Sequence, residues 1–184
     1  MLWNRNARAE DFTTVRLGLG RMDISSMIRT PAVRFSIRSD ELEEQPAKLK
    51  EDYQTILQIP SLLCIGQHKL TGIIGEQARV QEVVRNIVLQ LAMLHSYTDV
   101  RLIGLFREGE QELFSWLRWL PHVFSPDKSH RLLACSEADY QAVLSYLLDV
   151  LRARDSRDAL QSGEAPLPVY VVLCTDPKIL YNHA

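Results

Sequence analysis

The chain has 184 residues, enough for one domain of ordinary size with a core of its own. Hydrophobic residues make up 46% and charged residues 24%, which is the balance of a globular protein and excludes a disordered one. A net charge of -2 argues against a surface built to neutralise nucleic-acid phosphates, and no run of 18 or more apolar residues is present to span a membrane.

The N-terminal segment MLWNRNARAED is charged and lacks the apolar stretch of a signal peptide. The cysteines are odd in number, and each lies in an apolar, strand-like run: Cys64, Cys135 and Cys174. Their spacing fits neither a zinc site nor a disulfide framework. We therefore expect buried, reduced thiols in a cytoplasmic compartment.

Residues 1–60 are expected to form a lead-in segment that packs on an α/β core at residues 61–184, within a single domain. Alternating apolar residues and glycines predict an irregular β region over residues 12–37, with strands at Val15–Leu19 and Ala32–Ile37.

A helix is expected next, in the segment ELEEQPAKLKEDYQTIL, with Ser39 or Asp40 as its N-cap. Pro46 cannot donate a backbone hydrogen bond and its ring clashes with the preceding turn, so we expect two short helices or one that begins late. Short apolar strands then follow at Ser61–Ile65 and Leu70–Ile74, on either side of the turn-like GQHK.

Residues 77–95 carry the clearest helical signal. Apolar residues recur there at i, i+3, i+4 and i+7 positions: Val80, Val83, Val84, Ile87, Val88, Leu91 and Leu94. Charged and polar residues lie off this stripe. The pattern predicts an amphipathic helix that covers a sheet.

The remaining segments alternate between strand and helix. Buried strands are predicted at Val100–Phe106, Arg131–Cys135 and Val169–Thr175. Helices are predicted at Glu110–Leu117 and after Ser136, where Asp139 completes a capping box. From residue 70 onward this order favours right-handed crossovers between parallel strands. The predicted fold class is α/β, a mostly parallel sheet flanked by helices.

A phosphate-binding loop would follow the strand at 70–74, at the start of the long helix. Its pattern G-x-x-x-x-G-K-[ST] is absent, because the chain reads GIIGEQARVQ from Gly72, and counting from Gly72 or from Gly75 supplies neither the lysine nor the hydroxyl. Glu76 favours the helix dipole and would repel a triphosphate, while Arg79 lies one turn further on. The position is right for a phosphate loop and the chemistry is missing.

Asp176 follows the most β-prone strand, where nucleotide hydrolases place a magnesium-binding acid. We favour the alternative that Asp176-Pro177 opens a turn, since no lysine partner is present. No histidine has a second ligand at metal spacing, so no metal site is expected. His95 is expected to cap the long helix, where a positive ring would suit the dipole.

Four segments resemble the EssC/EccC family of type VII secretion ATPases, which are related to the FtsK/SpoIIIE translocases. They are DFTTVRLGLG at 11–20, GIIGEQARVQEVVRNIVLQLAMLHSYTDVRLIGLF at 72–106, WLRWLPHVF at 116–124 and LPVYVVLCTD at 167–176. LHS-x-x-DVRL followed by W-x-x-WLPH is the specific pair. The resemblance covers most of the chain, in the segment between the transmembrane helices and the first FtsK-like domain.

The resemblance implies a degenerate P-loop (RecA/FtsK-like) domain at the cytoplasmic face of the bacterial membrane. It further implies partners in the membrane part and motor domains of the same chain, other secretion components, homo-oligomeric assembly, and a role in exporting small helical-hairpin (WXG100-type) proteins. ATP and Mg²⁺ would then belong to other domains of the parent protein, and no cofactor is expected here. Strands that complete the sheet are expected beyond residue 184.

Trp116, Trp119, Pro121 and His122 form the most distinctive cluster, and exposed aromatic residues often anchor interfaces. We weigh a docking surface at these residues against the alternative that they only fill the gap between helix and sheet. Arg101, Arg107, Arg118 and Arg131 are interpreted as solvated edges rather than as arginine fingers.

The leading hypothesis is a non-catalytic scaffold that positions the motor domains. The alternatives are a diverged hydrolase using Gly75, Arg79 and Asp176, or a nucleotide sensor without turnover.

Overall fold

The computed structural model describes residues 2–24, 27, 29, 41–158 and 168–182. They form two compact units: the ribbon unit, Thr14–Ile87, and the sheet unit, which joins Met1–Thr13 to Val88–Ala184. Within the described ranges, no helix is long and apolar enough to cross a membrane. The division expected at residue 60 stays a prediction.

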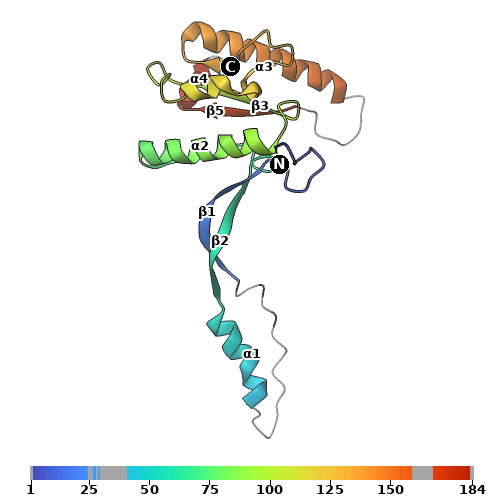
Figure 1. Cartoon of the computed structure of the whole chain (residues 1–184), viewed down its shortest axis with the longest axis vertical. Helices are drawn as coiled ribbons and strands as arrows, with labels where there is room; N and C mark the ends of the chain where they lie inside the picture. Colours follow the sequence, from blue (N-terminus) through green and yellow to red (C-terminus); the bar gives the residue numbers. More distant parts are fainter. Residues whose placement is uncertain (1, 25–26, 28, 30–40, 159–167, 183–184) are drawn as a thin grey trace. The chain divides into compact units, whose positions relative to one another are not determined.

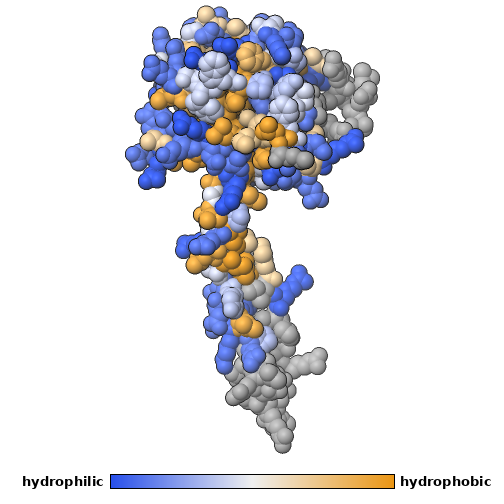
Figure 2. Space-filling view, in the orientation of Figure 1, coloured by the Kyte–Doolittle hydropathy of each residue, from blue (hydrophilic) through white to orange (hydrophobic). Residues whose placement is uncertain are grey.

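The ribbon unit is built on two antiparallel strands, β1 (Thr14–Asp23) and β2 (Thr55–Cys64), joined through a segment that contains α1 (Glu41–Asp52) (Figure 1). The register shifts at two points, between Arg16 and Gly18 and between Gly20 and Arg21. Apolar surface remains along the ribbon (Figure 2). Large apolar side chains that stay exposed include Leu19, Leu57 and Leu62.

The expected interruption at Pro46 is wrong, because α1 continues through this residue to Asp52. Pro46 is the sixth residue of the helix, so it removes only one of the earliest i to i−4 bonds. The helix also stops short of the predicted end. The residues from Thr55 onward pair with β1 instead, so a tertiary ladder overrides the local helical preference. The strand at Ala32–Ile37 and the caps Ser39 and Asp40 lie outside the described residues.

The predicted strand Leu70–Ile74 is not formed. These residues lie in an irregular segment between β2 and α2 (Gln77–Leu94), and the side chains of Leu70 and Ile74 are 91% and 99% exposed. A short apolar run indicates a strand only if a neighbouring strand offers hydrogen bonds, and β2 forms its ladder with β1. The strand that would lead into a phosphate loop is therefore absent from this part of the structure.

The sheet unit contains a parallel three-stranded sheet in the order β4-β3-β5. The central strand β3 (Val100–Leu105) is buried along its whole length and pairs with β5 (Val169–Cys174) from Val100↔Val169 to Leu105↔Cys174. The edge strand β4 (Leu133–Ala134) is shorter than predicted. α3 (Glu137–Asp158) covers one face, and the part of α2 from Val88 onward covers the other (Figure 1). The α/β class with a parallel sheet is confirmed.

A local N-cap and burial against the sheet together determine where α3 forms. Ser136 begins it, because the N–H of Asp139 donates to Ser136 Oγ at 3.3 Å, as the capping signal predicts. The side chains of Tyr140, Val143 and Leu144 are buried against the sheet. Leu148 and Leu151 lie further along, 43% and 49% exposed. Ile179 of the short helix α4 (Pro177–Asn182) joins the same core.

The helix predicted at Glu110–Leu117 is replaced by turns and two short 3-10 helices, η1 (Ser115–Trp119) and η2 (Pro121–Val123). Leu120 between them is extended, with φ −81° and ψ 132°, because a residue before proline avoids the α region. Phe114 stacks on Phe106 with ring centroids 4.1 Å apart, and this contact anchors the segment to the end of β3.

Candidate functional site

The degenerate phosphate-loop residues belong to the ribbon unit. Gly72, Gly75 and Glu76 are exposed, and a Cβ added at Gly72 would meet no atom within 4 Å. Glu76 and Arg79 approach each other to 3.8 Å with 75% and 81% of their side chains exposed, and such a pair contributes little to stability. Around these residues no backbone is packed closely enough to require glycine.

Asp176 belongs to the other unit and begins α4. Its Oδ1 accepts a hydrogen bond from the N–H of Lys178 at 3.0 Å, and its carbonyl oxygen accepts one from the N–H of Ile179 at 3.0 Å. This is the geometry of a helix N-cap, in line with the interpretation of Asp176 as a turn opener. Because the carboxylate is already used, Asp176 has an ordinary structural role at this position.

Two buried histidines join separate parts of the sheet unit. His95 Nε2 accepts a hydrogen bond from the N–H of Thr13 at 3.1 Å, and its Nδ1 lies 3.2 Å from the carbonyl oxygen of Leu91 in the last turn of α2. His122 Nε2 lies 3.0 Å from the carbonyl oxygen of His95. Burial lowers the pKa of both rings below the ordinary value. His95 therefore does contact the helix end as expected, but as a neutral ring rather than a positive one.

The three interaction candidates have different environments. His122 is 1% exposed and has the structural role just described. Trp119, at the end of η1, is 76% exposed, and Pro121 at the start of η2 is exposed as well. The guanidinium of Arg118 lies over the Trp119 ring, 5.1 Å from its centroid. Only Trp119 and Pro121 are therefore available to a partner.

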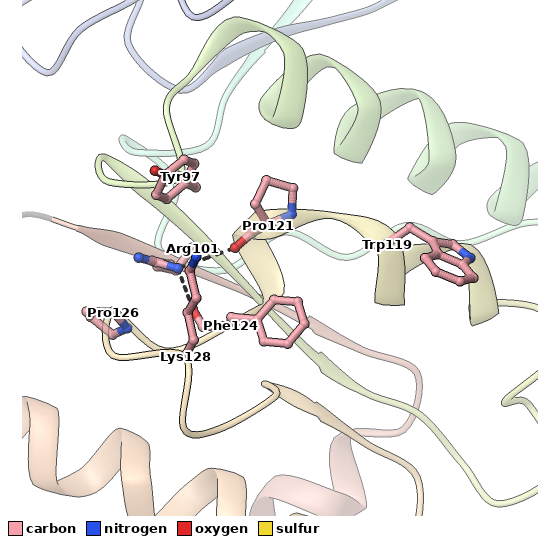
Figure 3. A pocket seen from close by; sticks show the side chains of 7 residues that line it. All are labelled: Tyr97, Arg101, Trp119, Pro121, Phe124, Pro126 and Lys128. Atoms are coloured by element: carbon pink, nitrogen blue, oxygen red, sulfur yellow. Dashed lines mark hydrogen bonds between the residues drawn. The ribbon is translucent and has the colours of Figure 1, made fainter.

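Trp119 and Pro121 line a cavity of about 340 Å³ in the sheet unit (Figure 3). The other walls are the aromatic rings of Tyr97 and Phe124 together with Pro126. Two cations complete the lining, Arg101 and Lys128. The cavity thus combines an apolar wall with positive charge, and among the described residues no carboxylate, imidazole or thiol contributes to its lining.

Arg101 is the unusual member of this set, because its side chain is buried with only 5% of the residue exposed. Its Nη1 donates to the carbonyl oxygens of Phe124, at 2.5 Å, and Pro121, at 3.3 Å. Its guanidinium carbon lies 5.5 Å from the centroid of the Tyr97 ring. Its Nε is buried and finds no hydrogen-bond partner in the described part of the chain. Among the described residues, no carboxylate pairs with Arg101.

The loop that carries Pro126 and Lys128 is fixed by its own polar side chains. Asp127 accepts hydrogen bonds from the hydroxyls of Ser125 and Ser129, both at 2.5 Å, and these lower the pKa of Asp127 to about 2. The N–H of Lys128 donates to the carbonyl oxygen of Ser125 at 2.9 Å, with Lys128 at φ 60°. Asp127 is thereby held within the loop, and Lys128 is presented on the rim of the cavity.

The cavity lies at the beginning of the strands, whereas ligands of open α/β sheets bind beyond the carboxyl ends. Arg101 is the second residue of β3 and pairs with Tyr170 of β5. Tyr170 and Cys174, the last residue of β5, are four positions apart, so roughly 13 Å of strand lies between this level and the end where Asp176 follows. The cavity and the expected nucleotide position are therefore different places.

Sequence reasoning missed Arg101 as a site residue, since it was interpreted as a solvated edge. A signal was present: Arg101 interrupts the apolar run VRLIGLF of a strand predicted to be buried on both faces. An arginine there must either reach solvent or find buried partners. Which of these applies depends on the carbonyl oxygens of Pro121 and Phe124, which come close only in the folded chain.

No known family model matches the chain. Curated relatives nevertheless align with 99% of it, and all three that we compared are proteins of bacterial type VII (ESX) secretion. The chain is thus similar over almost its whole length to segments of type VII secretion proteins. The relatives are the ESX secretion system protein EccC of Geobacillus thermodenitrificans at 27% identity, YukB of Bacillus subtilis at 24%, and the type VII secretion system protein EssC of Staphylococcus aureus at 25%.

These relatives confirm the resemblance to the EssC/EccC family. The chain spans about 12% of their length, so it corresponds to one segment of a much longer protein in each of them.

Proposed function

We propose that this chain is a non-catalytic interaction domain of a type VII secretion protein, which links the membrane part of its parent protein to FtsK-like motor domains during protein export. The homology to EccC, YukB and EssC supports the role in secretion. The cavity beside Arg101 supports the role in interaction. On this proposal the domain works at the cytoplasmic side of the membrane in a homo-oligomeric assembly, and ATP and Mg²⁺ act elsewhere in the parent protein.

The observation that carries the proposal is the exposure of Trp119. A tryptophan that is 76% exposed beside a cavity with a buried arginine has the composition of an interface anchor, because tryptophan and arginine dominate binding energy at protein interfaces. The phosphate-loop position, in contrast, lacks the features that its ligand would need. It has no lysine, no hydroxyl and no preceding strand, so it gives little support to nucleotide binding.

Titration calorimetry separates this proposal from the nucleotide sensor. ATP and ADP with magnesium are titrated into the 184-residue chain and into a longer chain extended past residue 184. We expect no heat of binding up to millimolar nucleotide. Micromolar affinity in either chain would favour a sensor or a diverged hydrolase over a scaffold.

Site-specific photo-crosslinking tests the interaction role directly. A photoreactive amino acid replaces Trp119 in the intact secretion protein inside the bacterium. Asp149 serves as a matched control, because it is on α3 with 74% of its side chain exposed. We expect crosslinks from position 119 to the motor domains, the membrane part or another secretion component, and none from position 149. Equal products from both positions, or none from either, would contradict the proposal.

A further inference from the structure

We infer that the cavity beside Arg101 binds an acidic side chain, Asp or Glu, together with an adjacent apolar side chain, on a peptide segment of a partner protein. This inference rests on the proposed interaction role and adds the chemistry of the occupant. It depends on three properties of the cavity: its unbalanced charge, the nature of its walls, and the exposure of its rim.

The charge of the cavity is positive and unbalanced. Arg101 and Lys128 line it, and among the described residues neither forms an ion pair. The buried Nε of Arg101 is a donor to which no described residue offers an acceptor. A buried donor of this kind is costly unless something accepts from it, and an ionised acceptor forms the stronger bond. A carboxylate meets both requirements, since it accepts hydrogen bonds and neutralises the charge.

Asp127, the acid next to Lys128 in the sequence, cannot supply this carboxylate. Asp127 uses both of its carboxylate oxygens on Ser125 and Ser129, and it does not line the cavity. Asp99, close to Tyr97 in the sequence, accepts from the hydroxyl of Thr98 at 3.1 Å and does not line the cavity either. No carboxylate of the described residues therefore neutralises the cavity, and we take a partner protein as its source.

The walls offer apolar contact and few further hydrogen bonds. Pro121 and Pro126 have no backbone N–H, and the carbonyl oxygens of Pro121 and Phe124 already accept from Arg101. Figure 3 shows the guanidinium of Arg101 directed between Tyr97 and Pro126. A sugar or a nucleotide base needs several donors and acceptors, whereas the described wall residues other than the two cations offer only the hydroxyl of Tyr97 and the indole N–H of Trp119 as side-chain groups. An aliphatic or aromatic side chain next to a single acid matches them better.

The size and the rim favour a peptide over an enclosed small molecule. A volume of about 340 Å³ is at the lower end of the roughly 300–1,000 Å³ typical of ligand pockets, and suits one or two side chains. Trp119 leaves most of its surface exposed beside the cavity. A peptide that continues past the cavity covers this indole, whereas a small ligand inside the cavity leaves it in water.

The inference is tested with a pair of blocked peptides, Ac-Pro-Phe-Glu-Leu-NH2 and the same peptide with Gln in place of Glu. Each is titrated into the ¹⁵N-labelled 184-residue chain, and the indole N–H signal of Trp119 and the backbone signals of residues 97–101 and 119–128 are followed. We expect saturable shifts in the millimolar range for the Glu peptide, and at least about tenfold weaker binding for the Gln peptide, because a charge-assisted hydrogen bond is lost.

Three variants locate the site. Lys128→Gln on the rim and Trp119→Ala should each weaken binding of the Glu peptide about threefold or more, and both positions are exposed, so folding is retained. Arg101→Lys should weaken it further, since lysine keeps the charge without the planar fork. Arg152→Gln removes one positive charge from the exposed face of α3, so binding should not change.

The outcomes separate this inference from the proposed function. Equal binding of both peptides, or no binding by either, overturns the carboxylate site, while crosslinks from position 119 would still uphold the interaction role. ATP that displaces the Glu peptide with shifts at Arg101 would overturn both, because the occupant would then be a nucleotide. The site would also be overturned if Arg152→Gln weakened binding as much as Lys128→Gln. The peptide would then be attracted by the positive charge of the protein in general and not bound at the cavity.

Discussion

His122 Nε2 lies 3.0 Å from the carbonyl oxygen of His95, so two buried imidazoles belong to one hydrogen-bonded chain that continues to Leu91 and Thr13. The pair holds the segment after η1 against the end of α2. Both rings are neutral in this arrangement, since burial lowers both pKa values. Arg5, Asp11 and Asp99 also act on His95, and Arg101 acts on His122, but burial has the largest effect on each pKa.

This pair makes stability depend on pH. In the unfolded chain both histidines titrate near 6.5, whereas in the folded chain they resist protonation, so the unfolded state binds protons first as the pH falls. The contribution of the pair is complete above pH 6.5 and decreases as the pH falls below it. We expect a lower Tm at pH 5.5 than at pH 7.5. His122→Gln, which keeps a donor near Nε2, should have a smaller difference, and an identical pH dependence in this variant would contradict the assignment.

Leu91 and Leu89 make a matched pair on α2, because one is 0% exposed and the other 42%. Leu91→Asp places an unpaired carboxylate in the core, which costs several kcal/mol against a total stability of about 5–15 kcal/mol. We expect this variant to be unfolded or insoluble by circular dichroism and gel filtration. Leu89→Asp should stay folded with a Tm close to that of the parent chain. Similar behaviour of the two variants would contradict the burial of this helix.

Gly104 is required by close packing at the centre of the sheet. A Cβ at this position would lie 2.4 Å from Phe106 Cε2 and 2.8 Å from Leu133 Cδ2, and the Phe106 ring is itself held by stacking on Phe114. Overpacking of this kind costs about 1–3 kcal/mol, or roughly 2–12 °C in Tm for a chain of this size. Gly18→Ala is the control, since its Cβ meets no atom within 4 Å. Thermal melts of Gly104→Ala and Gly18→Ala test this packing, because only Gly104→Ala should lower the Tm by that amount.

Glu76→Lys tests whether one missing residue is all that separates this chain from a nucleotide hydrolase. The substitution brings a lysine to the start of α2, but the preceding residues Leu70 and Ile74 are exposed and form no strand. We expect no ATPase activity in the purified variant, measured by phosphate release against a chain with no substitution. Turnover above that background would show that the segment at 70–76 can assemble a phosphate loop.

Periodicity and capping chemistry were enough to predict the elements that depend on local signals. The stripe of α2, the cap at Ser136 and the strands β3 and β5 formed where their patterns indicated, because a helix pairs most of its backbone groups within itself and a longer apolar run is typical of a strand buried in a sheet. The resemblance to EssC and EccC likewise followed from residues quoted in order along the chain, and the relatives confirm it.

Only the tertiary structure decided which short apolar runs became strands and which polar groups were buried. Thr55–Cys64 pairs with β1 while Leu70–Ile74 pairs with nothing, since a strand exists only where a neighbour completes its hydrogen bonds. Arg101 is buried because two carbonyl oxygens, 20 and 23 positions away in the sequence, accept from it. Contacts between residues so far apart in the sequence form only when the chain folds, so no local sequence pattern predicts them.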